Sequence, residues 1–432
     1  MRVRRDLTGR HILGSVAPMR LGDVSNEGAA SAGKPLDGVR ILALEQMQAL
    51  PYATQLLARL GADVVKVENP AGGDLGRGSQ PAMVDPDGRN VGATFLRNNL
   101  NKRSICIDLK APAGRDLVLQ LVPHFDVIAE NSKAGSMQRL GLGYADIAAV
   151  HPGAIYLSVS GFGNTVASPY DSWPAFAPVV EAMSGIYEFK RRGDDPPVVA
   201  PVGALGDIGS GLYAVIGVLA ALRHREATGV GQHVDIAMLD AMVAMTDLVT
   251  NFWSLGLRGG ALAPLIMDGF RAGDGWFIIQ VGREPQFAKL ADLVGHPDWP
   301  RDPRFSDRQG WVDHLDDVIR PAVETWAADK TRLEACAAMS AAGIAAGPCY
   351  RDDEVVADEH LAARHMLVEV PRTDGVDAPV LVPGNPVKLT NVAEGPETRM
   401  PWLGEHTDEV LAAELGLDSD ALAALRTDGV IA

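Results

Sequence analysis

The sequence has few cysteines: Cys106, Cys336 and Cys349 are the only three among its 432 residues. An odd number of widely separated cysteines, without a CxxC pair, argues against a disulfide framework and against a zinc site. The ten histidines form neither an HExxH nor a His-x-His motif, so the sequence predicts no metal site. This usage suits a reducing compartment, and we expect a cytoplasmic protein.

Basic residues and long apolar runs are also scarce. Lysine and arginine number 39 against 55 acidic residues, which gives a net charge of −16. Such a surface argues against nucleic acid and anionic membranes as partners. The longest apolar stretch, residues 212–222, is shorter than the roughly 20 residues that span a bilayer, so it predicts a buried helix. Residues 1–34 are basic but lack the apolar core of a secretory signal. We expect a flexible extension there, with a transit peptide as the alternative.

Strand-like and helix-like segments alternate from residue 34 onward. Short apolar runs that predict buried strands lie at residues 38–44, 62–68, 103–109, 126–131 and 154–163. Helical patterns lie at residues 53–61 and 112–125, the second with Pro112 at its start. Alternation of this kind predicts an α/β fold with a parallel sheet covered on both faces.

Glycine is missing where a dinucleotide-binding fold needs it. The first strand-to-helix turn reads EQMQALPYAT and contains no glycine, although a pyrophosphate site requires GxGxxG there. Glu68 ends the second strand, where a ribose-binding acid would stand, but it is a weak signal alone. The sequence also lacks a P-loop and a GxSxG nucleophile motif.

The later part of the chain predicts a second domain. After a strand at residues 232–238 we expect a long helix, then a glycine-rich loop at residues 256–273. A strand at residues 275–282 and three helical segments follow. We therefore predict three parts after the extension. They are a large α/β domain begun by residues 35–240, a small α+β domain with linkers over residues 241–360, and a return to the large domain over residues 361–432.

A single carboxylate, Asp207, stands in the glycine-rich stretch GALGDIGSGLYAVIG. Aspartate is a common helix N-cap, and a helix that begins here would explain it without any function. Gly209 and Gly211 weaken that interpretation, because each costs roughly 1 kcal/mol against alanine in a helix. A carboxylate near a helix N-terminus stays ionised and can attack an activated acyl group. On these residues alone, both interpretations stay open.

The segment GALGDIGSGLYAVIGVLAALRHREATGVGQHVDIAMLDA closely resembles the region of the catalytic aspartate in class III (CaiB/BaiF) CoA-transferases. Further blocks follow in the family's order, among them LLARLGADVVKVENPAGGD, VIAENSKAGSMQRLGLGY and GIAAGPCYRDDEVVADEHLAAR. The resemblance covers about residues 35–416. It implies a Rossmann-like large domain built from both chain ends, a smaller inserted domain and an interlocked homodimer.

The resemblance also implies a reaction. CoA would move from an acyl-CoA thioester to a free carboxylic acid, with no tightly bound cofactor and no metal. Asp207 matches the nucleophile, which would form a mixed anhydride and then an aspartyl-CoA thioester. Gln48 matches a glutamine near that thioester, and Met47 and Ala49 would lie beside it.

Five polar positions would serve the CoA moiety. Lys110, Asn131 and Arg139 match family positions that hold its nucleotide and pantetheine, and Lys102 and Arg103 would supply positive charge nearby. They fall at strand ends and helix starts, where ligands bind in such sheets. An ordinary solvated surface charge is the alternative explanation for Lys102 or Lys110 taken alone.

Two departures from the family narrow the function. The related α-methylacyl-CoA racemases carry a histidine-aspartate pair where this sequence has Phe176 and Ala177, and neither of these exchanges a proton. This disfavours racemase or isomerase activity, and retention of Asp207 disfavours a non-catalytic CoA-binding relative. Some transferases carry a carboxylate at the place of Ala177. We expect Phe176 and Glu181 to lie in the substrate pocket. Glu181, four residues after Ala177, is expected to substitute for that carboxylate in part, and an exposed helical glutamate is the alternative.

The second departure concerns protection of the intermediate. Formyl-CoA transferase has a long glycine-rich loop over its aspartate, whereas the stretch at residues 256–270 is short here. Water must be kept from an anhydride or an aspartyl thioester. Either another segment covers the aspartate, or the acceptor acid differs in size from that of formyl-CoA transferase. The sequence therefore does not identify the donor thioester or the acceptor acid.

Overall fold

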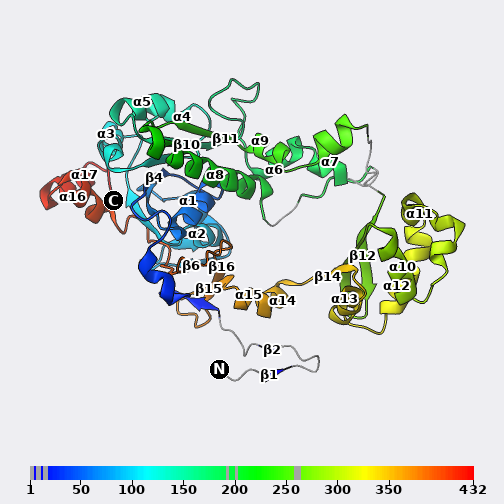
Figure 1. Cartoon of the computed structure of the whole chain (residues 1–432). Helices are drawn as coiled ribbons and strands as arrows, with labels where there is room; N and C mark the ends of the chain where they lie inside the picture. Colours follow the sequence, from blue (N-terminus) through cyan, green and yellow to red (C-terminus); the bar gives the residue numbers. More distant parts are fainter. Residues whose placement is uncertain (1–3, 6–10, 13–17, 191–193, 200–202, 257–263) are drawn as a thin grey trace. The chain divides into compact units, whose positions relative to one another are not determined.

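The computed structural model describes residues 4–5, 11–12, 18–190, 194–199, 203–256 and 264–432 (Figure 1). The contacts divide the chain into two compact units. Unit 1 consists of Met1–Phe252 and Glu359–Ala432, and unit 2 of Trp253–Asp358. The chain thus leaves unit 1 once and returns to it.

A six-stranded parallel sheet forms the centre of unit 1. Its strands are β4 (Arg40–Leu44), β5 (Asp63–Glu68), β8 (Lys102–Cys106), β9 (Val127–Glu130), β10 (Ile155–Ser160) and β11 (His233–Ala237). They lie in the order β11-β10-β9-β4-β5-β8, and every pair is parallel. This is the strand order of Rossmann-type sheets. The predicted parallel α/β architecture is therefore confirmed.

Helices cover both faces of this sheet, and each face has its own apolar core (Figure 1). On one face lie α1 (Ala49–Arg59), α6 (Ala177–Met183), α8 (Leu205–Thr228) and α9 (Met238–Ala244). On the other lie α3 (Pro112–Leu121), α5 (Tyr144–Val150) and the C-terminal helices α16 (Thr407–Leu415) and α17 (Ser419–Thr427). Strands such as β4 and β10 bury nearly every residue, which explains their continuous apolar sequence.

Glycines let α8 pack closely against its neighbours. A Cβ atom on Gly211 would lie 2.8 Å from the carbonyl oxygen of Ala49 and 2.9 Å from the ring of Tyr52, both on α1. By length and composition α8 is the one helix among the described residues that could cross a membrane, and half of its most apolar window is buried inside the fold. Its packing between the sheet, α1 and α9 is that of a core helix.

Three segments differ from the sequence predictions. The helix after β11 is not long, because α9 ends at Ala244 and a π-helical segment, Leu248–Ser254, follows. The expected boundary at residue 241 lies inside α9, which packs on α8. Part of the expected loop is strand β12 (Ile266–Ala272), paired antiparallel with β13 (Gly275–Val281). Residues 257–263 lie outside the described residues.

Unit 2 is an α+β unit with its own aromatic core. Strands β12, β13 (Gly275–Val281) and β14 (Ala345–Pro348) form an antiparallel sheet. Helices α10 (Glu284–Leu293), α11 (Arg308–Asp313), α12 (Arg320–Ala327) and α13 (Arg332–Ala341) accompany it. The last helix of unit 2 is α14 (Asp352–Val356), and α15 (Glu359–Ala363) begins the returning part of unit 1.

The N-terminal and C-terminal segments meet in a small satellite sheet of unit 1. Strand β3 (Met19–Arg20) pairs in parallel with β15 (Leu367–Val370), which pairs with β16 (Val380–Pro383). Met19 is buried in the same apolar cluster as Val368. This part of the expected flexible extension is therefore built into the fold, while residues 1–3, 6–10 and 13–17 lie outside the described residues.

Smaller elements fill the remaining connections of unit 1. They are β6 (Ala82–Val84), β7 (Asn90–Gly92), α2 (Ala93–Asn98), α4 (Ser136–Leu140), α7 (Ile186–Lys190) and the 3-10 turn η2 (Leu75–Gly78).

We predict that Gly211→Ala destabilises the protein by about 1–3 kcal/mol, because its Cβ meets backbone and ring atoms that cannot withdraw. Gly209→Ala is the matched control on the same helix, since its Cβ meets only the flexible end of Met245. We expect that variant to stay within about 1 kcal/mol of the parent. Chemical denaturation measures both changes, and equal losses would contradict the account of α8 packing.

Candidate active site

The centre of the sheet places several segments side by side at one edge. Strands β4 and β9 are neighbours, and the chain leaves them toward opposite sides of the sheet. In open parallel sheets, ligands bind outside the carboxyl ends of the strands at this switch point. Here β4 leads into residues 45–48 and β9 leads into Asn131.

A cavity of about 250 Å³ opens at this edge. Segments that follow β4, β9, β10 and β11 form its wall together with the first turn of α8. Its lining residues are 46–49, 131–134, 159–162, 173–176, Leu75, Asp171, Asp207 and Met238. Most of the wall is apolar, and Asp207 and Asp171 are its carboxylates.

The turn from β4 into α1 is held rigidly against the cavity. The side-chain amide of Asn131 accepts a hydrogen bond from the backbone nitrogen of Gln46 (2.9 Å) and donates one to its carbonyl oxygen (2.8 Å). The backbone nitrogen of Met47 donates to Oδ1 of Asp74 (2.7 Å). Met47 has a φ of 63°, which non-glycine residues rarely adopt. A strained residue held by neighbours thus stands where dinucleotide folds place glycine.

Buried charges behind the turn hold it in place. Nζ of Lys66 lies 2.7 Å from Oδ2 of Asp74 and 3.4 Å from Oε1 of Glu45, and Nζ of Lys102 lies 2.7 Å from the same Glu45 oxygen. Burial alone would raise the pKa of Glu45, but the charges of Lys102 and Lys66 outweigh it and lower the pKa. Burial lowers the pKa of Lys102 to about 8. Removing one member would leave an uncompensated buried charge.

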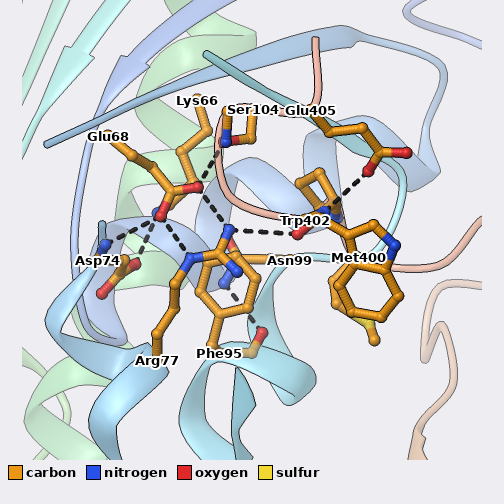
Figure 2. A network of polar contacts seen from close by, with 12 residues as sticks. Lys66, Glu68, Asp74, Arg77, Phe95, Asn99, Ser104, Met400, Trp402 and Glu405 are labelled. Carbon is orange, nitrogen blue, oxygen red and sulfur yellow. Dashed lines mark hydrogen bonds and ion pairs between the residues drawn. The ribbon is translucent and has the colours of Figure 1, made fainter. Parts of the chain in front are cut away.

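A second layer ties this network to the C-terminal segment, as Figure 2 shows. The guanidinium of Arg77 binds both oxygens of Glu68 at 2.6 and 2.7 Å and lies 3.7 Å above the ring of Phe95. The hydroxyl of Ser104 donates to Glu68 (2.6 Å). Arg77 also donates to the carbonyl oxygen of Pro401 (3.2 Å). Glu68 is therefore an anchor for Arg77 and not a ribose ligand, because its oxygens are occupied.

Asp207 lies in the first turn of α8, which begins at Leu205 with Ala204 as its N-cap. The N-cap interpretation of Asp207 is therefore wrong. Burial raises the pKa of Asp207 to about 6, and the negative charge of Glu181 adds to the rise. No hydrogen bond from a described residue opposes this shift. Asp207 is thus a carboxylate at neutral pH, but one with unusually weak solvation.

Glu181 was expected in the substrate pocket, but it lies behind Asp207 and does not line the cavity. It is only 3% exposed. Its Oε1 accepts a hydrogen bond from the backbone nitrogen of Gly206 (2.9 Å), and its Oε2 accepts one from the hydroxyl of Tyr187. The alternative of an exposed helical glutamate is excluded by this burial.

Three comparisons place the chain among known proteins. A family model described as CoA-transferase family III matches residues 36–407. The chain is 34% identical over 410 residues to a succinyl-CoA–D-citramalate CoA-transferase of Chloroflexus aurantiacus, covering 92% of this chain and 98% of that protein. It is 33% identical to a formyl-CoA:oxalate CoA-transferase of Streptomyces avermitilis, covering 92% and 100% of the two chains.

A solved structure agrees with both sequence comparisons. A CaiB/BaiF family protein from Brucella suis matches with a TM-score of 0.77 and 32% identity, over 88% of this chain and 100% of that one. The chain belongs to CoA-transferase family III. The resemblance inferred from the sequence is confirmed, and the protein is an enzyme of the class III CoA-transferases. Such enzymes use CoA thioesters as co-substrates, and no group of three metal-binding side chains occurs in the part of this CoA-transferase that the structure describes.

The structure brings six predicted site residues of this CoA-transferase together around the cavity. They are Met47, Gln48, Ala49, Asn131, Phe176 and Asp207. Lys110 and Arg139 do not line it, and both side chains are exposed. A CoA molecule is much longer than a cavity of this size, so the roles of Lys110 and Arg139 stay predictions.

The expectation for Lys102 and Arg103 was wrong. Lys102 is fully buried and donates to Glu45, so its charge is already neutralised. Arg103 points toward Asp63, 2.6 Å away, and toward Glu409. Neither side chain lines the cavity. Successive residues of a strand point to opposite faces, which sends one side chain inward and the other outward.

Several cavity residues were missed in the sequence. Lys133 follows Asn131 at the end of β9, and its Nζ donates to the carbonyl oxygen of Ser172 (2.5 Å). Trp173 belongs to an aromatic cluster with Tyr170 and Phe162. Position after a parallel strand was the available signal for Lys133. Nothing in the local sequence of residues 170–173 indicated a cavity wall.

We predict that Asp207→Asn stabilises the protein in a pH-dependent way. The pKa of Asp207 in the folded protein lies above its value in the unfolded chain. Ionisation of Asp207 therefore lowers the stability of the folded state as the pH rises from about 4 to about 6, and below about pH 4 this loss is absent. We expect a gain of about 2 kcal/mol at pH 8 that falls below about 1 kcal/mol at pH 4.5. Urea denaturation at both pH values measures it. The exposed control Asp240→Asn should change little at either pH, and a larger gain for Asp207→Asn at pH 4.5 would contradict the assignment.

Proposed function

We propose that this CoA-transferase moves CoA from an acyl-CoA thioester to a free carboxylic acid through a covalent aspartyl-CoA intermediate on Asp207. The observation that carries the proposal is the position of Asp207. Its carboxylate lines the same cavity as residues 46–49 and Asn131, at the switch point of the sheet. The raised pKa also supports it, because a weakly solvated carboxylate is a better nucleophile than a fully hydrated one.

The proposed steps balance without an added proton or oxidant. An oxygen of Asp207 attacks the thioester carbonyl, the C–S bond breaks, and CoA leaves as a thiolate. The thiolate then attacks the aspartyl carbonyl of the mixed anhydride and releases the donor acid, which leaves an aspartyl-CoA thioester. The acceptor carboxylate attacks that thioester, and the returning thiolate attacks the acceptor carbonyl. A new acyl-CoA forms and Asp207 is free again.

The residues opposite Asp207 have proposed roles in this sequence. Gln48 is the N-cap residue of α1 and makes no side-chain capping hydrogen bond, so its amide is available to the reacting carbonyl. Met47 and Ala49 shape the wall beside it, and Asn131 holds the turn through both of its hydrogen bonds to Gln46. Backbone N–H groups at the start of a helix favour a developing oxyanion.

The racemase alternative lacks its histidine-aspartate pair at this cavity. Phe176 is the N-cap residue of α6 and lines the cavity, and Ala177 is buried beside it. Neither side chain accepts a proton. We therefore keep CoA transfer as the proposed chemistry. Short dicarboxylic acids are the first acceptor acids to screen, because the names of the two relatives include succinyl-CoA, citramalate and oxalate.

We further propose a homodimer in the cytoplasm. The resemblance to the CaiB/BaiF family favours interlocked chains, and α8 leaves several large apolar side chains exposed. They are Leu205, Leu212, Ile216 and Leu219. Widely spaced cysteines, all unpaired, suit a reducing compartment.

We predict that Asp207→Ala abolishes CoA transfer, with a loss of at least about 1,000-fold in kcat, because the covalent route disappears. CoA thioesters should still bind, since the other cavity residues remain. The parent enzyme incubated with succinyl-CoA should yield a CoA adduct on the peptide that contains Asp207, detected by mass spectrometry. Full activity in the variant would overturn the proposal.

A further inference from the structure

An unusual pair of carboxylates meets at the first turn of α8: Asp207 belongs to that turn, and Glu181 belongs to α6. Asp207 faces the cavity, and Glu181 reaches the preceding residue, Gly206, from behind. Glu181 is nine-tenths buried or more, as its exposed fraction of 3% shows. Burying a carboxylate is costly unless it is hydrogen-bonded, and here two donors from two different elements hold it.

These contacts fix where the nucleophile stands. The backbone nitrogen of Gly206 belongs to the unsatisfied N–H groups of a helix start, and Glu181 satisfies it at 2.9 Å. A side chain on Gly206 would meet Val180 at 2.8 Å and the backbone of Ala177 at 3.1 Å. The first turn of α8 is therefore pressed against α6 and pinned there by Glu181. Asp207, the next residue, has little freedom to move.

The same arrangement acts on the charge of Asp207. No cation pairs with either carboxylate among the contacts of the described residues. The other charged groups of the cavity wall are Lys133 and Asp171. Asp240 on α9 is exposed, and α7 contributes the hydroxyl of Tyr187. The negative charge of Glu181 therefore disfavours a free carboxylate at Asp207.

Resting on the proposed function, we infer that Glu181 is a positioning residue that fixes the first turn of α8 through Gly206 and favours the covalently bound, uncharged form of Asp207. When Asp207 attacks the thioester, its negative charge passes to the CoA sulfur as the C–S bond breaks. The repulsion from Glu181 ends at that step. Glu181 itself touches no substrate.

Glu181→Gln tests this inference, because glutamine keeps the size of the side chain and an oxygen for Gly206 but removes the charge. The probe is succinyl-CoA, or the most active thioester of the screen. The measured quantity is the rate of CoA adduct formation at Asp207 between pH 4.5 and 8.5. In the parent enzyme we expect a half-maximal rate near pH 6. In the variant we expect this midpoint to fall by about one pH unit, and the adduct fraction at pH 7.5 to fall about tenfold.

Two further variants make the result specific. Glu226→Gln removes one negative charge from the surface of α8, where the Glu226 side chain is 67% exposed and pairs with Arg223. We expect the pH midpoint of adduct formation to stay unchanged in this variant. Glu181→Asp restores the charge but shortens the reach to Gly206, so we expect a midpoint near that of the parent with a slower rate. If Glu181→Gln fails to fold, the rate of adduct formation in Glu181→Asp still tests whether Glu181 positions the first turn of α8.

The outcomes separate the two claims. A midpoint in Glu181→Gln equal to that of the parent would overturn the role of Glu181 and leave the covalent mechanism intact. Absence of any adduct on Asp207 in the parent enzyme would instead overturn the proposed function.

Discussion

The site depends on holding the carboxylate of Asp207 in a place that solvates it poorly. In water, a carboxylate is strongly hydrated and a weak nucleophile toward a thioester. At Asp207 burial removes much of that hydration, and the described residues supply no hydrogen bond in its place. The folded state therefore carries an electrostatic cost at neutral pH. The covalent attachment that we propose would relieve this cost, and it would link the instability of the free site to its chemistry.

Such a site requires a rigid surrounding, because an unsatisfied carboxylate would otherwise turn toward solvent or a cation. The close approach of α8 to α1 at Gly211 and to α6 at Gly206 supplies that rigidity on one side. On the other side, Met47 keeps its strained conformation through Asp74, which the buried Lys66 holds in turn. Close helix packing thus fixes one part of the wall, and buried ion pairs fix the other.

The sequence predicted those structural elements that leave a pattern in neighbouring residues. The parallel strands follow from continuous apolar runs. The glycines around Asp207 weakened its interpretation as an N-cap without excluding it, and only the resemblance to the family assigned it the role of nucleophile. The resemblance to the family placed Met47 and Asn131, and both lie in segments that follow sheet strands. By contrast, Lys102 and Arg103 are adjacent basic residues that the sequence does not distinguish. Their orientation on β8 in the structure shows that Lys102 is buried and that Arg103 pairs with Asp63.

Features that arise from tertiary contacts could not be predicted from local sequence patterns. Glu181 could be an exposed helical residue in any reading of residues 177–183, and its burial depends on where α7 and α8 lie. Strand β12 was hidden because its stretch begins in a glycine-rich segment and contains only weak alternation. The buried network of Glu45, Lys66 and Asp74 joins residues up to 29 positions apart, which no local pattern reveals.

Oxygen tracing tests the central claim most directly. With succinyl-CoA as donor and succinate labelled with oxygen-18 in its carboxylates as acceptor, the returning thiolate should leave one acceptor oxygen on the enzyme. After several turnovers, the peptide that contains Asp207 should gain the mass of that label, and the Asp207→Ala peptide should not. Exchange of CoA between the two acids with no label on Asp207 would contradict the account, because it would mean that the acids react without passing through this side chain.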